Sequence, residues 1–125
     1  MKNINLTIRS VNEGLKKGEF SVEEVRQEYL KKIQEESPKL NAYLSVFDSP
    51  RAALSLPRAA LGSILSGVPC AVKDNILIGG EKCTAASKIL ENYTAPYDAT
   101  VIVKLKATGA VFLGKTNLDE FAMGS

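Results

Sequence analysis

Two short apolar segments on either side of a helix-like stretch place the strongest constraint on the fold of this chain. Residues 68–72 (VPCAV) and residues 110–113 (AVFL) are each typical of a buried strand, and polar side chains follow both. Between them, Asp98 fits the N-cap of a helix and Gly109 fits its C-terminal cap, although the β-branched residues 100–103 would also suit a strand. A strand, a crossover helix and a second strand form a βαβ unit, so the sequence predicts an α/β fold.

Two amphipathic helices are predicted before this unit. The shorter covers about residues 7–17 and has a glycine just past its end. The longer begins at a capping box formed by Ser21 and Glu24, and its apolar residues recur at helical spacing. We expect it to end at residues 37–38, because a proline disfavours helical backbone in the residue before it. The apolar faces of the two helices predict that they pack together.

The chain is expected to form a single domain, because no repeat, low-complexity tract or linker divides its 125 residues. Residues 1–40 would form a helical arm, and residues 41–125 would form the α/β portion. Within that portion, residues 42–48 (AYLSVFD) are typical of a strand. Residues 50–61 contain two prolines and fit either a helix or a loop.

Composition excludes several classes of protein. The net charge is only +2 and the lysines are interleaved with glutamates, so the basic footprint of a dedicated nucleic-acid binder is missing. The chain has no apolar run long enough to cross a bilayer and its start is too polar for a secretory signal, so we expect a cytoplasmic protein. Without histidine, these residues alone cannot build a Ser-His-Asp, Cys-His or Cys/His metal site. We therefore expect no bound metal, and reduced, packed thiols at Cys70 and Cys83.

The segment GAVFLGKT at residues 109–116 matches the pattern of a nucleotide-binding phosphate loop. Such a loop must be an open turn of small residues, whereas the interior of this segment is Ala-Val-Phe-Leu, which favours a core. Asp119 and Glu120 would also lie in the first turn of the next helix, where they would repel a phosphate. We interpret the segment as a buried strand and keep nucleotide binding as the weakest alternative.

Two lysines at the predicted strand ends are candidate catalytic groups. Ligands of open α/β sheets collect at the carboxyl ends of the strands, where Lys73 and Lys115 stand. Lys73 is the better candidate, because Asp74 and Asn75 could orient its amine and desolvation would favour the neutral form. Either lysine could instead be solvated and without a role, and Asp74 is expected to be structural, bonding nearby backbone N–H groups. The serines at positions 66, 87 and 125 carry no nucleophile motif and are expected in turns or caps.

The stretch GVPCAVKDNI, followed by CTAASKILENYTAPYDATVIVKLKATGAVFLGKTNLDEFAMGS, resembles the amidase-signature family. The likeness runs over essentially the whole chain and is strongest over residues 67–125. That family is known for a Ser–cis-Ser–Lys triad, in which the lysine acts through the bridging serine as the base for a nucleophilic serine. The resemblance implies that Lys73 is the catalytic lysine and that Met123, Gly124 and Ser125 lie beside the substrate. A lysine base also accounts for a chain without histidine.

The resemblance has further implications for the whole protein. The two serines of the triad lie further on in the family, so these residues would be one part of a larger mixed-sheet fold and inactive alone. The likeness is greatest to members that work in glutamine-dependent amidotransferases, which implies glutamine as the substrate and the other amidotransferase subunits, B and C, as partners. It also implies that tRNA binds mainly through one of these partners, and that ATP and Mg²⁺ bind there, with no cofactor in this chain. The alternatives are a hydrolase of small amides and a non-catalytic domain that binds partner proteins.

Overall fold

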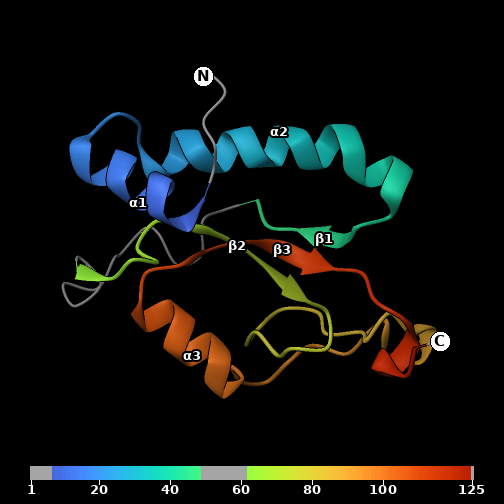
Figure 1. Ribbon diagram of the computed structural model, residues 1–125. Helices are drawn as coiled ribbons and strands as arrows, with labels where there is room; N and C mark the ends of the chain where they lie inside the picture. The colour runs from blue at the N-terminus through green and yellow to red at the C-terminus, as the bar shows by residue number, and fades with distance from the viewer. Residues whose placement is uncertain (1–6, 49–61, 125) are drawn as a thin grey trace.

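The computed structural model describes residues 7–48 and 62–124. Within these residues, helices cover both faces of a mixed sheet, which confirms the predicted α/β fold (Figure 1). Residues 50–61, expected to form a helix or a loop, lie outside the described residues. The elements are α1 (Ile8–Lys17), α2 (Val22–Leu40), β1 (Tyr43–Val46), β2 (Pro69–Lys73), the 3-10 helix η3 (Lys88–Leu90), α3 (Thr100–Ala107), β3 (Val111–Thr116) and the 3-10 helix η4 (Glu120–Ala122).

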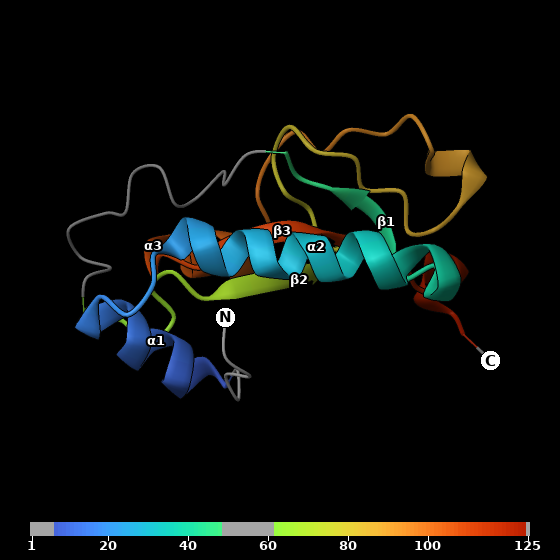
Figure 2. The same cartoon turned by 90° about the horizontal axis from the view of Figure 1, so that it is seen from above.

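The sheet has the strand order β1-β3-β2. Strands β2 and β3 are parallel and are joined through α3, which confirms the βαβ unit, while β1 pairs with β3 in the antiparallel direction. Helix α2 lies along one face of the sheet and α3 along the other, as Figures 1 and 2 show. The segment matched to a phosphate loop is therefore largely strand β3, whose residues from Val111 to Lys115 are buried, and the nucleotide-binding alternative has no open loop to support it.

The N-terminal helices begin and end largely where cap chemistry predicts. A capping box links Thr7 to Ser10 at the start of α1, and Gly18 ends that helix with a left-handed φ of 69°. The box of Ser21 and Glu24 begins α2, as expected. The predicted end of α2 is wrong, because the helix continues through Pro38. The proline stands in the last turn, where few further helical bonds remain to be broken, and the N–H of Asn41 still donates to the carbonyl of Ser37 at 2.7 Å.

Helix α3 begins differently from the prediction. Its N-cap is Ala99, which makes no side-chain cap bond, rather than Asp98. The carboxylate of Asp98 instead accepts a hydrogen bond from the N–H of Gly79 at 2.8 Å and one from the Lys106 amine. A contact with a distant loop has thus replaced the local cap. Gly109 has a φ of 78° just beyond the helix, which confirms the predicted C-terminal cap.

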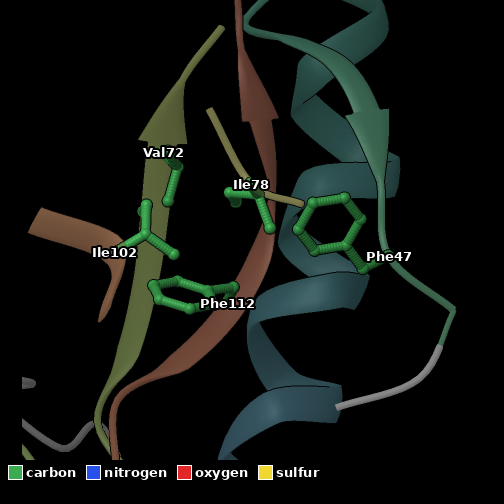
Figure 3. Close-up of a cluster of buried hydrophobic side chains, with 5 residues drawn as sticks. All are labelled: Phe47, Val72, Ile78, Ile102 and Phe112. Atoms are coloured by element: carbon green, nitrogen blue, oxygen red, sulfur yellow. The ribbon is translucent and has the colours of Figure 1, made fainter. Parts of the chain in front are cut away.

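Two apolar clusters hold the helices to the sheet. The first lies between the sheet and α3, and Figure 3 shows its side chains turned toward one another. The second joins the helical arm to the start of β2. Burial of each such side chain stabilises the fold by roughly 1.5–3 kcal/mol. The first cluster contains Phe47, Val72, Ile78, Ile102 and Phe112, and the second contains Val11, Phe20, Val25 and Val68.

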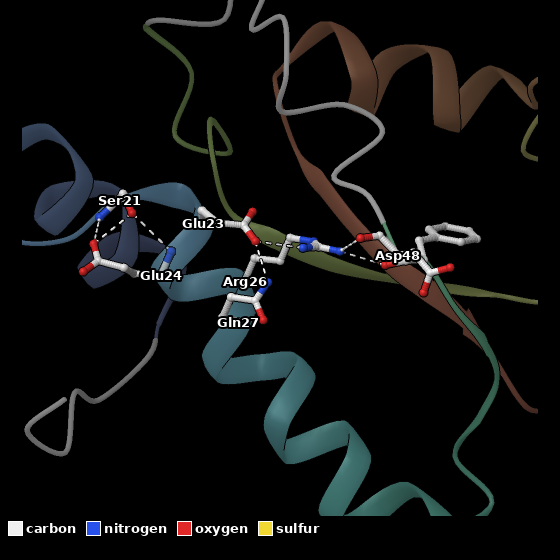
Figure 4. A network of polar contacts seen from close by, with 7 residues as sticks. Ser21, Glu23, Glu24, Arg26, Gln27 and Asp48 are labelled. Carbon is white, nitrogen blue, oxygen red and sulfur yellow. Dashed lines mark hydrogen bonds and ion pairs between the residues drawn. The ribbon is translucent and has the colours of Figure 1, made fainter.

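A buried arginine fixes α2 to the chain that leaves β1. Arg26 is only 2% exposed, and its Nη2 donates to the carbonyl oxygens of Phe47 at 2.8 Å and Asp48 at 2.7 Å (Figure 4). Its Nη1 forms an ion pair with Glu23 at 2.9 Å. The sequence did not single out this residue, because an arginine on a helix is usually solvated.

Candidate functional site

The candidate site lies at the carboxyl end of β2, where Lys73 is the last residue of the strand. Lys73 pairs with Thr116 in the register of β2 and β3, and its side chain is exposed. Successive side chains of a strand point to opposite faces, so Lys73 lies on the face opposite Val72, which belongs to the buried core. The expected desolvation of Lys73 is not found among the described residues, because its side chain is exposed at the last residue of an edge strand.

Lys115, the other candidate lysine, is buried rather than solvated. Its Nζ lies 2.8 Å from the Oδ1 of Asp74, and the two side chains are 1% and 2% exposed. The same amine donates to the carbonyl oxygen of Lys82 at 3.0 Å. Lys115 therefore has no free amine with which to meet a substrate, and its role is internal.

Asp74 is structural, as expected from the sequence. Its Oδ2 accepts hydrogen bonds from the backbone N–H of Thr84 at 2.9 Å and from the hydroxyl of the same residue. Its own N–H donates to the carbonyl of Thr116, and its carbonyl accepts from the N–H of Ala85, both at 3.0 Å. Asp74 thus joins the end of β2 to the end of β3 and to the segment of residues 82–85.

An irregularity in the sheet brings Lys115 to Asp74. Cys70 pairs with Phe112, but the next residue of β2, Ala71, pairs with Gly114, so Leu113 is an extra residue in β3. The extra residue reverses the alternation of faces. Lys115 consequently lies on the same face as Phe112 rather than on the opposite one. The sequence contains no clear signal for this shift, which explains why Lys115 was considered only as a candidate catalytic group or a solvated lysine.

Two strained turns lie side by side beyond the strand ends. Ala85 and Ala86 have φ values of 50° and 54°, and Phe121 and Ala122 have values of 56° and 55°. A left-handed backbone conformation in a residue other than glycine costs on the order of 1–3 kcal/mol, and such residues are often found at functional sites. The N–H of Phe121 donates to the carbonyl of Ala85 at 2.9 Å, so the two turns hold each other.

Ser87 and Glu120 strengthen this junction. The hydroxyl of Ser87 donates to the Oε1 of Glu120 at 2.7 Å, and it also accepts from the N–H of Ile89 at the start of η3. Ser87 is therefore a cap residue, as predicted. Asp119 stands at the N-cap of η4 but makes no side-chain cap bond. Asn117 does not cap η4 either: its Nδ2 donates to the carbonyl of Asn41, and its Oδ1 accepts from the N–H of Leu118.

The residues expected beside the substrate follow this junction. Met123 is 78% exposed and Gly124 is also exposed, while Ser125 lies outside the described residues. A Cβ on Gly124 would stand 2.1 Å from the Oδ2 of Asp119, so only glycine fits there without a shift of that carboxylate. The roles of these residues and of Lys73 stay predictions.

The two cysteines are free, as expected. Burial raises the pKa of the Cys70 thiol. Burial also raises the pKa of the Cys83 thiol, against the opposing charge and hydrogen bond of Lys115. Among residues 7–48 and 62–124, no three His, Cys, Asp or Glu side chains gather closely enough to hold a metal ion. In the same residues, no helix has both the length and the apolar composition that a membrane crossing requires.

Comparison with known proteins identifies relatives of the whole chain. The A subunit of glutamyl-tRNA(Gln) amidotransferase from Lactobacillus acidophilus is 48% identical over 125 residues, which are 100% of this chain and 26% of the relative. Its counterpart from Lactobacillus gasseri is 49% identical over the same length and share. The chain thus spans about a quarter of the length of the curated relatives that it matches.

Solved structures and a family model agree with these relatives. The crystal structure of the corresponding amidotransferase protein from Thermotoga maritima matches 97% of this chain and 25% of that one, with 43% identity and a TM-score of 0.76. A peptide amidase in complex with the inhibitor chymostatin matches 97% of this chain and 26% of its own, with 27% identity and a TM-score of 0.84. The family model described as Amidase matches residues 24–125. The chain therefore belongs to the amidase family, the amidase-signature family that its sequence resembles.

Proposed function

We propose that this chain is the lysine-bearing part of the glutaminase component, the A subunit, of a glutamyl-tRNA(Gln) amidotransferase. The observation that carries the proposal is the position of Lys73 at the carboxyl end of β2, exposed on the face opposite the core. The relatives that are 48% and 49% identical over the full chain carry that name. The proposal extends their activity to this protein.

The proposed chemistry uses the Lys73 amine as a base. The neutral amine takes a proton, through a bridging serine, from a nucleophilic serine that attacks the amide carbon of glutamine. Ammonia leaves as the acyl-enzyme forms, and water then releases glutamate. The ammonia passes to a tRNA-bound glutamate, which one of the partner subunits would activate with ATP and Mg²⁺. Those cofactors would be held by that partner and not by this chain.

Lys73 is a better base than Lys115 on geometric grounds. The amine of Lys115 is enclosed by the Asp74 carboxylate and by the carbonyl of Lys82, so it cannot approach a substrate. The side chain of Lys73 is exposed at the end of an edge strand, where further parts of a larger fold and a substrate can reach it. We infer that the serines come from such further parts and that the 125 residues alone release no ammonia.

The test is ammonia release from glutamine by the full-length polypeptide that contains this chain, assembled with its partner subunits. The Lys73→Ala variant should lose about 10²–10⁴-fold in kcat, the usual range for loss of a positioned base. The Lys104→Ala variant is the matched control, because Lys104 is an exposed lysine on α3. Retention of activity by Lys73→Ala, with the control also active, would show that Lys73 is not the base.

A hydrolase of small amides is the second candidate, because a peptide amidase shares this fold at a TM-score of 0.84. The two functions differ in their need for partners. Hydrolysis of simple amides at full rate by the isolated full-length polypeptide, without partner subunits, would favour the small-amide hydrolase. Glutamine hydrolysis that requires the partner subunits would favour the amidotransferase.

A further inference from the structure

The pair of Lys115 and Asp74 is a buried charge pair directly beside Lys73 in the chain and in the sheet. Such pairs seldom stabilise a fold more than well-packed apolar side chains would, because removal of both charges from water is costly. We propose that this pair is a positioning device, which fixes the end of β2 and thereby aims the amine of Lys73. The inference rests on the proposed function, since it needs Lys73 to be the base.

The geometry around Asp74 carries the first step. Asp74 is fixed on every side: its backbone binds Thr116 and Ala85, its Oδ2 binds Thr84, and its Oδ1 binds Lys115. The Cys83 thiol also donates to its carbonyl at 3.3 Å. Because Asp74 is held by both its backbone and its carboxylate, the backbone dihedral angles of the preceding residue, Lys73, can vary little. The backbone of Lys73 is thus fixed in direction.

The other side of Lys73 is fixed as well. Val72 pairs with Lys115 across the two strands and belongs to the buried core. Lys73 therefore lies between Val72 and Asp74, two residues whose side chains lie on the opposite face of the sheet. Val72 pairs with Lys115 in the sheet, and Asp74 forms the ion pair with it. The carbonyl of Lys73 is bound too, since it accepts from the N–H of Ile76 at 3.0 Å.

The position of Lys115 joins three segments at this point. From β3, its amine reaches Asp74 after β2 and the carbonyl of Lys82 in the following loop. The extra residue of β3, Leu113, is what turns Lys115 toward them. An apolar side chain could fill this space, but it could not bind the carboxylate and the carbonyl together. Loss of the pair should therefore let the end of β2 shift while the core stays packed.

The experiment uses the full-length polypeptide with its partner subunits and the double variant Asp74→Asn/Lys115→Met. This variant removes both charges together, so that neither is left buried alone, and Asn can still accept the hydrogen bonds of Thr84. We expect kcat for glutamine hydrolysis to fall about 10–100-fold with KM within about twofold of the parent, because small misplacements of a catalytic group cost rates of this order. The Arg26→Met variant is the control for general destabilisation and should keep the parent kcat at temperatures where it is folded.

A second variant tests the inference in case the double variant does not fold. Thr84→Val is nearly isosteric and removes the hydroxyl bond to the Oδ2 of Asp74, together with the bond that this hydroxyl accepts from the N–H of Ala86 at 3.1 Å. We expect it to fold and to lower kcat about 3–10-fold without a change in KM, in the same direction as the full loss of the pair. If the double variant does not fold and Thr84→Val keeps the parent kcat, the positioning role is overturned.

The outcomes separate this inference from the proposed function. Parent-like kcat in the folded double variant, with Lys73→Ala inactive, overturns the positioning role and leaves Lys73 as the base. An active Lys73→Ala variant overturns the proposed function and this inference with it. A lower kcat in the double variant, an unchanged KM and an inactive Lys73→Ala support both.

Discussion

Gly114 and Ser45 approach each other so closely that a Cβ on Gly114 would stand 2.2 Å from the carbonyl oxygen of Ser45. The same Cβ would lie 2.9 Å from the Cα of Val46. Both neighbours are backbone atoms of β1, which is bound to β3 and cannot move aside cheaply. The glycine that completes the apparent phosphate-loop pattern is therefore needed for strand packing.

The Gly114→Ala variant should consequently be less stable than the parent. Overpacking of a tight contact costs roughly 1–3 kcal/mol of stability. We expect a loss at the upper end of this range, because the atoms that the new Cβ would meet belong to the backbone. The measurement is the Tm and the free energy of unfolding of the full-length protein. Gly62→Ala is the matched control, since a Cβ there would meet nothing within 4 Å. Equal losses in the two variants would contradict the prediction.

Arg26→Met should also destabilise the protein. The variant leaves the carbonyl oxygens of Phe47 and Asp48 without their donor, and an unsatisfied buried group costs about 1–3 kcal/mol. Arg9→Met, at an exposed position of α1, should change the free energy of unfolding little. Denaturant unfolding of the two variants checks this, and a parent-like midpoint for Arg26→Met would show that water replaces the guanidinium.

The capping box of α2 should give the stability a dependence on acid pH. Hydrogen bonds from the backbone and side chain of Ser21 lower the pKa of Glu24 from its usual value of 4.5. A lowered pKa in the folded state means that ionised Glu24 stabilises the fold above about pH 4.5, and that this contribution is lost as pH falls through the folded-state value.

Glu24→Gln is the variant that tests the pH dependence. Gln can still bind at the cap but carries no charge, so the parent should be more stable than the variant at pH 7 and equal to it in strong acid. Glu35→Gln, at an exposed position of α2, serves as the control. A gap between parent and Glu24→Gln that stays constant down to pH 2 would argue against a lowered pKa.

Much of the fold could be predicted because its signals are local. The glycine after α1, the capping box of α2, the apolar runs of β2 and β3, and Gly109 after α3 each act within a few residues of chain. The same reasoning placed Lys73 at the end of a strand, where the structure has it.

The parts that could not be predicted depend on contacts between distant residues. Asp98 binds Gly79 rather than capping α3, because the loop of Gly79 returns to it in the fold. Lys115 is buried because one extra residue in β3 turns it toward Asp74. Lys73 is exposed rather than desolvated, at the last residue of a strand that the sheet order places at an edge. None of these contacts produces a recognisable pattern in the sequence around the residues that make it.

The two thiols should differ in reactivity from exposed cysteines. Cys83 is only 5% exposed and its thiol donates to the carbonyl of Asp74, while Cys70 is partly buried. Because burial raises the pKa of both thiols, the thiolate that reacts with iodoacetamide is scarce at pH 8.

We expect Cys83 to be alkylated more slowly than Cys70, and both more slowly than after unfolding in guanidinium. Mass spectrometry of the peptides that contain each cysteine measures the two rates separately. Alkylation of Cys83 in the native protein at the rate of the unfolded chain would mean that the contact between its thiol and Asp74 opens readily.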